Sequence, residues 1–287
     1  MAVFKLGSDK ATYLCGVVFN ASQGLHSKSQ DILDYLTLTP DAHGHLVPRT
    51  NPLDFAIITD AGPVQFGTES VFAPRYTLFT CPPGLGRNCA ILVRSRLATV
   101  RKPHHDPSGR ALAVDVVPEV GGNKYIRLVA LYQHPGLDYI AAVPPGAQVP
   151  PFNDSLAGAK SIPRKARRME AERLRRTVLR WRSDKRVGFT ILGSDSNETV
   201  LGALDRQTTS EGRPGKERAG TIHAMLDDDA WCDWYRRCHP APLDDLDLSM
   251  ATKGHTYFDP GGGSSLIDYV MVPCSQSRRD VHSRCFV

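Results

Sequence analysis

The segment Phe189-Thr-Ile-Leu-Gly-Ser-Asp-Ser-Asn197 is a short apolar run that ends in two polar side chains, Asp195 and Asn197. The apolar half, Phe189 to Leu192, is typical of a buried β-strand. Because side chains alternate along an extended segment, we expect Asp195 and Asn197 on the same side of it. Such a pair can hold or deprotonate a water while it donates to an oxyanion. The same residues also suit an ordinary turn or helix cap, so this segment alone leaves both interpretations open.

Three other apolar runs end in the same way, in the polar residues Asn20, Asp60 and Tyr132. A rigid sheet fixes the geometry of side chains at its strand ends, and sites are often built there. We therefore expect these residues and Asp195 to lie around one cleft. Oxygen donors such as Asn20, Asp60 and Asp280 suit Mg²⁺ or Mn²⁺ rather than zinc.

The composition is ordinary for a globular protein. The 287-residue chain is 41% hydrophobic and 23% charged, and it is long enough for one large domain or two small ones. It contains no apolar run of the roughly eighteen residues that a membrane span needs. Its first residues, Met1 to Ser8, lack the apolar core of a signal peptide. We therefore expect an intracellular protein that does not enter a membrane.

The cysteine pattern favours reduced thiols. Seven cysteines are scattered along the chain, at positions 15, 81, 89, 232, 238, 274 and 285. The count is odd and no Cys-x-x-Cys pair occurs, which argues against a disulfide framework or a zinc site. Buried free thiols are the expected outcome.

The hydrophobic pattern predicts short strands mixed with helices. Strands are expected at residues 11–19, 55–58, 89–93, 126–132, 189–192, 256–258 and 266–272, and helices at about 27–38, 163–183 and 221–237. Elements that neither alternate strictly nor segregate suggest a layered α/β fold. No repeat or break in composition demands a second domain. We expect an N-terminal tail at residues 1–11 and a single domain at 12–287, with a mobile loop at about 206–220.

Charge is unevenly spread along the chain. The net charge is +5, and residues 161–187 hold eleven Lys or Arg against three acids, whereas residues 227–247 are rich in Asp. A basic helix on a basic protein suits a polyanionic partner, although a solvated helix face would have the same composition. If the partner is nucleic acid, the candidate contacts are Arg164, Lys165, Arg167, Arg168, Arg175 and Arg176.

The segment Ile191-Leu-Gly-Ser-Asp-Ser-Asn197 resembles the Gly-Gly-Asp-Phe-Asn motif of the endonuclease/exonuclease/phosphatase superfamily. Other segments resemble further motifs of that superfamily in the right order, at residues 18–25, 54–60, 88–94, 127–135, 233–240 and 264–272. The resemblance spans about residues 12–287. It implies a DNase-I-like four-layer α/β (α+β) sandwich, in which two mostly antiparallel sheets pack face to face with helices outside. Within the superfamily, the chain most resembles the endonuclease domain of non-LTR retrotransposons.

The resemblance also implies a role for each matched residue. Asp60 would take the place of a metal-binding Glu, and Asn20 would sit beside the metal. Tyr132 would contact the scissile phosphate. Asp195 would position or deprotonate the attacking water, and Asn197 would hold a phosphate oxygen.

The late motifs imply a carboxylate–imidazole pair. Asp268 would orient a histidine, for which His282 is the candidate, and Asp280 is a further candidate metal ligand. A carboxylate that fixes the tautomer of an imidazole also stabilises its charged form. Some positions depart from the family pattern: Asp60 is one methylene shorter than Glu, Leu266 stands where Arg or Lys is common, and one residue separates Asp280 from His282.

Two classes of function stay open at this point. The first is a Mg²⁺- or Mn²⁺-dependent phosphodiester hydrolase: a DNA-nicking endonuclease of retrotransposon type, with a phosphatase or deadenylase of the same fold as the alternative. The second is a catalytically decayed domain that still binds nucleic acid through residues 161–187. We expect a monomer with DNA as its partner. A transposon origin would add a nuclear location and a reverse transcriptase that is encoded elsewhere or lost.

Overall fold

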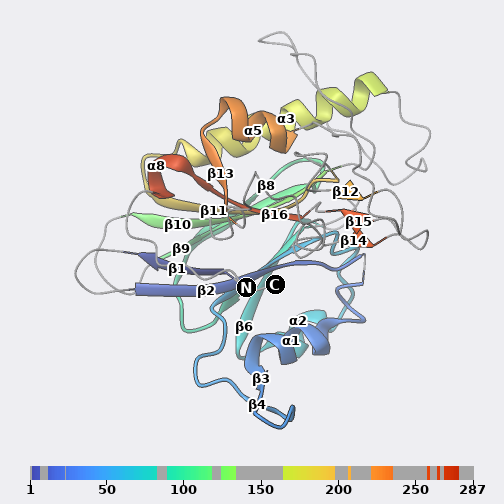
Figure 1. Cartoon of the computed structure of the whole chain (residues 1–287), viewed down its shortest axis with the longest axis vertical. Helices are drawn as coiled ribbons and strands as arrows, with labels where there is room; N and C mark the ends of the chain where they lie inside the picture. Colours follow the sequence, from blue (N-terminus) through green and yellow to red (C-terminus); the bar gives the residue numbers. More distant parts are fainter. Residues whose placement is uncertain are drawn as a thin grey trace.

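Two strands at the centre of the molecule are buried along nearly their whole length. Every residue of β5 (Phe55–Thr59) is buried, and so is every residue of β10 (Tyr125–Tyr132) after the first. A strand that is buried on both faces needs a layer on each side of it. Two sheets supply these layers by lying face to face, with helices on both outer sides (Figure 1). This computed structural model describes residues 2–6, 12–22, 24–82, 89–117, 124–133, 164–197, 206–207, 221–234, 257–258, 264–265 and 268–277.

The first sheet has the strand order β1-β2-β5-β7-β6. β1 (Ala2–Leu6) is antiparallel to β2 (Thr12–Asn20), whereas β2 and β5 are parallel. β7 (Ala90–Arg94) runs antiparallel to β5 and to β6 (Tyr76–Thr80). The sheet is thus antiparallel except for one central parallel pair.

The second sheet has the order β13-β16-β11-β10-β9-β8. Its central pair, β10 and β11 (Val187–Asp195), is parallel. The other neighbours are antiparallel, and they comprise β8 (Thr99–His105), β9 (Ala111–Val116), β13 (Trp231–Asp233) and β16 (Asp268–Pro273). In both sheets, therefore, one inner pair of strands is parallel and all other neighbouring strands are antiparallel.

Helices cover the outer faces of both sheets (Figure 1). α1 (Ser29–Thr37) and α2 (Thr68–Phe72) lie on the first sheet, and α3 (Arg164–Arg182) and α5 (Thr221–Asp228) lie on the second. α8 (Cys274–Ser277) directly follows β16. None of the described helices is both long and apolar enough to cross a membrane.

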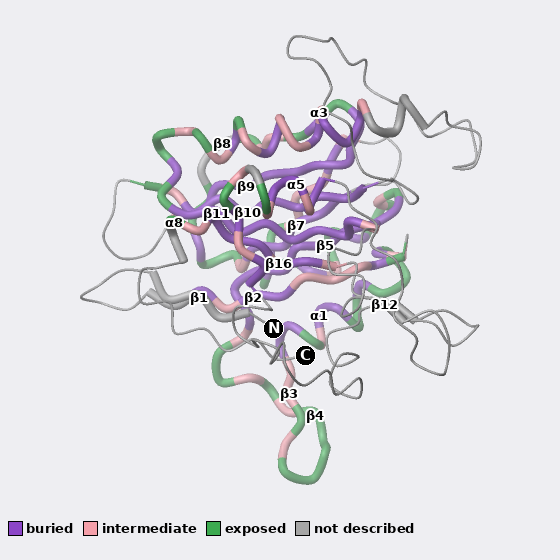
Figure 2. The backbone as a smooth tube through the Cα atoms, turned by 45° about the horizontal axis from the view of Figure 1, so that its top comes forward, coloured by how far each residue is buried: buried purple, intermediate pink, exposed green. Residues whose placement is uncertain are grey.

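Short strands complete the described structure. β3 (Leu38–Pro40) and β4 (Leu46–Pro48) pair as a hairpin that stands out from the body of the molecule and is largely exposed (Figure 2). β12 (Arg206–Gln207), β14 (Tyr257–Phe258) and β15 (Ser264–Ser265) form a small sheet of their own.

The buried apolar side chains fall into three clusters, one for each space between layers. Leu128 and Ile191 belong to the cluster between the sheets. Leu36 belongs to the cluster beneath α1 and α2, and Leu174 and Met225 belong to the one beneath α3 and α5. Figure 2 shows the buried strands as a continuous central block. The expected four-layer sandwich of two mostly antiparallel sheets between helices is confirmed.

Two boundaries differ from the sequence-based expectation. Residues 2–6, expected in a tail, form β1 and pair with β2 along their whole length. The helix expected at 221–237 ends at Asp228, because Ala230 adopts a left-handed conformation (φ 54°) and the chain then pairs with β16 as β13. A run of Asp residues has low helix propensity, which favours this early end.

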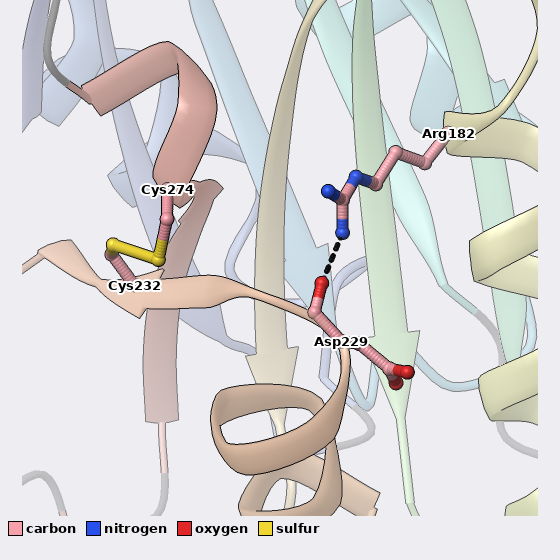
Figure 3. Close-up of a disulfide and its surroundings, with 4 residues drawn as sticks. All are labelled: Arg182, Asp229, Cys232 and Cys274. Carbon is pink, nitrogen blue, oxygen red and sulfur yellow. Dashed lines mark hydrogen bonds between the residues drawn. A yellow bond between two sulfur atoms is a disulfide. The ribbon is translucent and has the colours of Figure 1, made fainter.

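A disulfide joins Cys232 and Cys274, so the expectation of reduced thiols was wrong for this pair (Figure 3). The two Cα atoms are 5.4 Å apart because Cys232 lies in β13 and Cys274 follows the neighbouring strand β16. In the same corner Arg182 of α3 donates to the carbonyl of Asp229 (Figure 3). These bonds fasten β13 to both the second sheet and α3. Cys15, Cys81 and Cys89 are free thiols, as expected.

Candidate active site

The last residues of four strands meet at one edge of the sandwich. In the first sheet Asn20 of β2 lies opposite Thr59 of β5, and in the second Tyr132 of β10 lies opposite Asp195 of β11. Asp268, the first residue of β16, lies opposite Asp195 on its other side. Because parallel neighbours run in the same direction, they deliver their final side chains to the same edge.

A hydrogen bond joins the two sheets at this edge. The Nδ2 atom of Asn20 donates to Oδ2 of Asp195 over 2.6 Å. The close approach depends on Gly193, because a Cβ atom there would lie 2.7 Å from Ile57 and 2.8 Å from Val18 of the first sheet. Ordinary carbon atoms do not approach so closely. Gly193 therefore has a packing role just before the site.

Asp195 is almost wholly buried among other carboxylates. Burial, followed by the negative charges of Asp268 and Asp60, raises the pKa of Asp195 to about 8. Hydrogen bonds from the backbone N–H of Asn197 and from Asn20 act in the opposite direction. A carboxyl group with this pKa can exchange a proton with a bound water near neutral pH.

Asp60 and Asn197 both occupy the left-handed backbone region, with φ of 48° and 52°. Asp and Asn enter this region more readily than most residues, and such conformations cluster at functional sites. The side chain of Asn197 donates to the carbonyl of Gln133 over 3.0 Å, and the N–H of Gln133 donates to the carbonyl of Asp195 over 2.9 Å. The same residues thus form a turn and part of the candidate site. The two interpretations of the segment at 189–197, a turn and a site, are therefore compatible.

Tyr132 packs against a buried arginine that the sequence reasoning missed. The guanidinium of Arg110 lies 5.3 Å from the centre of the Tyr132 ring, and its side chain is buried. The carbonyl of Arg110 accepts a hydrogen bond from the N–H of Tyr132 over 2.8 Å. A buried cation makes this edge receptive to an anion. The signal in the sequence is a charged residue placed directly before the apolar run at 111–114.

The oxygen donors at this edge fit a hard divalent cation. Asn20, Asp60, Asp195 and Asp268 offer one amide and three carboxylates. Burial is the main cause of the raised pKa of Asp195, and the charges of Asp268 and Asp60 add a repulsion that a cation would relieve. Within the described ranges, no three Asp, Glu, His or Cys side chains are arranged to ligate one ion. Mg²⁺ commonly uses one or two carboxylates and completes its shell with water and substrate phosphate, so the donor set suits Mg²⁺ or Mn²⁺ better than zinc.

Helix α3 runs antiparallel to β10 and β11. Near its C-terminal end the carbonyl of Trp181 accepts a hydrogen bond from Arg127, which lies at the start of β10. In its middle, Nη2 of Arg173 donates to Asp106 over 2.6 Å, in the turn that connects β8 and β9 at the site edge. The nine residues before Arg173 therefore carry the helix about 13 Å further, past this edge (Figure 1).

The six predicted nucleic-acid contacts divide into two groups. Arg175 pairs with Asp229 over 2.7 Å and Arg176 with Glu172 over 2.8 Å, so these two side chains have anionic partners within the fold. The remaining four lie in the first turns of α3, which extend past the site edge: Arg164, Lys165, Arg167 and Arg168.

The structure brings six of the eight predicted catalytic and metal residues to this edge of the sandwich. They are Asn20, Asp60, Tyr132, Asp195, Asn197 and Asp268. The other two, Asp280 and His282, lie outside the described residues, as does most of the predicted mobile loop at 206–220.

No family model matches the chain, and no curated protein matches it in sequence. Solved structures do match it. The 3'-5' exonuclease NExo from Neisseria meningitidis gives a TM-score of 0.55 at 15% identity, covering 90% of this chain and 86% of that chain. The 3' phosphatase NExo from Neisseria, bound to a product DNA hairpin, gives 0.56 at 14% identity, covering 91% and 86%.

A humanized TDP2 from D. rerio gives a TM-score of 0.51 at 11% identity, covering 91% of this chain and 83% of that chain. At sequence identities this low, the match shows a shared fold and not a shared activity. The chain shares the fold of these structures, which is the DNase-I-like sandwich that the motif resemblance predicted.

Proposed function

We propose that the chain is a metal-dependent phosphodiester hydrolase whose active site lies where β2, β5, β10 and β11 end. The observation that carries the proposal is the 2.6 Å hydrogen bond between Asn20 and Asp195, which joins the two sheets at the edge that also carries Tyr132 and Asp268. The fold supports the reaction class, since two of the matched structures are a 3'-5' exonuclease and a 3' phosphatase bound to a product DNA hairpin.

Asp195 is the residue proposed to handle the attacking water. Its pKa of about 8 lies close enough to neutral pH for the carboxyl group to exchange a proton with a bound water. Asn20 donates to one of its carboxylate oxygens, and the N–H of Asn197 donates to the other over 3.3 Å. These two bonds hold the carboxylate in one orientation, which an in-line attack on phosphorus requires.

Tyr132 and Asn197 are the proposed donors to the phosphate oxygens, on which charge builds up as the water attacks. The guanidinium of Arg110 packs against the ring of Tyr132, and the carbonyl of Arg110 accepts a hydrogen bond from the backbone N–H of Tyr132. The bond of the Asn197 side chain to Gln133 fixes the turn that presents it. Both donors are therefore held in place before a substrate arrives.

A divalent cation, Mg²⁺ or Mn²⁺, would neutralise the phosphate and activate the water. Asp60 is the proposed ligand, with Asn20 and Asp280 beside it. Asp268 is proposed to orient His282, whose imidazolium would stabilise the charge that develops on the phosphoryl group.

DNA is the proposed substrate. The first turns of α3, which hold Arg164, Lys165, Arg167 and Arg168, extend past the edge where Asp195 lies, and we propose that the polyanion reaches this end of the helix. Within this class we propose a DNA-nicking endonuclease of retrotransposon type, on the strength of the late Ile-Asp-Tyr-Val motif and the basic helix. A monomer in the nucleus, working with a reverse transcriptase encoded elsewhere, belongs to that same proposal.

A cleavage assay tests the proposed function. The 287-residue chain is incubated with supercoiled plasmid, single-stranded DNA, poly(A) and inositol phosphates, each with Mg²⁺ and with EDTA. We expect nicked plasmid only with the cation. Turnover of poly(A) or inositol phosphates without plasmid nicking would identify a deadenylase or phosphatase instead. Salt-sensitive DNA binding with no cleavage of any substrate would identify a decayed nucleic-acid-binding domain.

A further inference from the structure

Phe66 is the most exposed large apolar side chain in the described part of the chain, with its ring wholly in solvent (relative exposure 105%). Two others are exposed, Tyr35 at 43% and Leu46 at 64%. The Tyr35 ring makes an edge contact with Phe19, with the ring centres 5.1 Å apart, and Leu46 lies in the β3–β4 hairpin. A phenyl ring in water lacks the free energy that its burial would provide. The place of Phe66 in the fold therefore bears on what the ring could contact.

The loop that carries Phe66 has a fixed shape. On one side of it, Val64 packs against the core beneath α1 and α2. The carbonyl of Gln65 accepts hydrogen bonds from the N–H and the hydroxyl of Thr68, over 3.2 Å and 2.8 Å. Gly67 takes a left-handed conformation (φ 89°) that other residues rarely adopt. Backbone geometry therefore presents the ring outward.

This loop belongs to the rim of the candidate site. It begins at Asp60, and the adjacent loop begins at Asn20. The two loops are bonded to each other, since the N–H of Leu25 donates to the carbonyl of Ala61 over 3.2 Å. Phe66 follows Asp60 by six residues, so their Cα atoms are at most about 20 Å apart even if the chain were fully extended. The exposed ring thus belongs to the loop that leads away from the proposed reaction centre.

We propose that Phe66 is a stacking platform for an unpaired base of a DNA strand that binds at the candidate site. The inference rests on the proposed function and adds a substrate preference to it, for DNA with unpaired bases next to the scissile phosphate. Every base has a π-face, so a single aromatic ring binds bases of any sequence. Because the loop is already ordered, little conformational entropy is lost when a base stacks on it.

Binding of a short fluorescent oligothymidine to the full chain in EDTA tests this inference, because no turnover occurs there. We expect Phe66→Ala to weaken binding about 5- to 100-fold, and Phe66→Trp to bind at least as tightly as the parent. Leu46→Ala is the matched control, another exposed apolar side chain but on the distant hairpin, and it should bind like the parent. Unfolding curves of all variants should coincide, since none of the changed side chains is buried.

An oligomer of the same length with abasic sites separates stacking from other contacts. We expect Phe66→Ala and the parent to bind it equally, because no base is present to stack. Equal binding of oligothymidine by Phe66→Ala and the parent would overturn the inference, and so would an equal loss with the abasic oligomer or a parent that binds neither. If the parent binds through Phe66 but cleaves nothing, the proposed hydrolase fails and the stacking site stands.

Discussion

At the scale of single residues, Asp195 links stability to pH. Burial and two nearby carboxylates raise its pKa from 3.8 to about 8. Between these values the folded chain holds a proton on Asp195 that the unfolded chain has released. The stability that Asp195 contributes is therefore fully present below about pH 4 and is lost as the pH rises to about 8. The group that we propose as catalytic therefore works against the stability of the metal-free protein.

Replacing Asp195 with Asn should remove this pH dependence. In EDTA, we expect the parent to lose on the order of a few kcal/mol of unfolding free energy between pH 5 and pH 8, and Asp195→Asn to lose clearly less. Urea unfolding at the two pH values measures both. Asp31→Asn, the same change at an exposed position of α1, should behave like the parent. Identical pH profiles for Asp195→Asn and the parent would contradict the assigned pKa.

Tyr132 gives a second prediction at this scale. Tyr132→Phe keeps the ring against Arg110 but removes the hydroxyl proposed to bind the phosphate. One hydrogen bond to a charged group corresponds to a loss of about 10- to 100-fold in kcat, with little change in melting temperature. Steady-state kinetics and thermal unfolding of the same preparations provide the comparison. Unchanged kcat would remove Tyr132 from the mechanism.

At the scale of elements, strand β11 brings the sheets together because it carries Gly193. We expect Gly193→Ala to cost about 1–3 kcal/mol, since its Cβ atom would collide with Ile57 and Val18, and to lower activity by separating Asn20 from Asp195. Gly188→Ala lies on the same strand at the other end, where the new atom would lie 2.9 Å from Cβ of the exposed Lys124, so it introduces a steric contact on the same strand but away from the site. It should keep its activity. Full activity in Gly193→Ala would mean that the inter-sheet contact does not shape the site.

Sequence reasoning found the central strands and the helices α1 and α3 because their signals are local. Apolar runs and helical spacing are properties of neighbouring residues, and so are the polar residues at strand ends. The disulfide between Cys232 and Cys274 was missed because its partners are 42 residues apart and meet only through the ladder of β13 and β16. Arg110 was missed for the same reason, since its contact with Tyr132 depends on the pairing of β9 with β10.

At the scale of the whole molecule, both parallel strand pairs, β2 with β5 and β10 with β11, end at the same edge of the sandwich. This brings segments that are distant in sequence together at the candidate site. Asn20 and Asp195 are 175 residues apart in sequence, yet topology alone delivers both to that edge. Their convergence was expected from the strand-end pattern. The direction of α3 was not, because it follows from contacts such as that of Arg173 with Asp106.

The direction of α3 predicts which of its charges bind DNA. We expect the double variant Arg164→Ala with Lys165→Ala to bind duplex DNA more weakly and to lower the slope of log K against log salt by about 1–2, since each lost phosphate contact removes about 0.9. The matched double variant Arg180→Ala with Lys185→Ala changes one exposed charge in the last turn of α3 and one just after the helix ends, and its slope should equal that of the parent. Equal slopes for both variants would place the DNA elsewhere.

The central claim is that one metal-dependent hydrolytic site lies where the parallel pairs end. Its most direct test is the rate of plasmid nicking in Mg²⁺ by the parent and by Asp195→Asn, with Asp31→Asn as the control. We predict Mg²⁺-dependent nicking by the parent and the control, abolished by EDTA, and a rate at least about 100-fold lower for Asp195→Asn. Nicking by Asp195→Asn at the parental rate, or by the parent in EDTA, would contradict the claim.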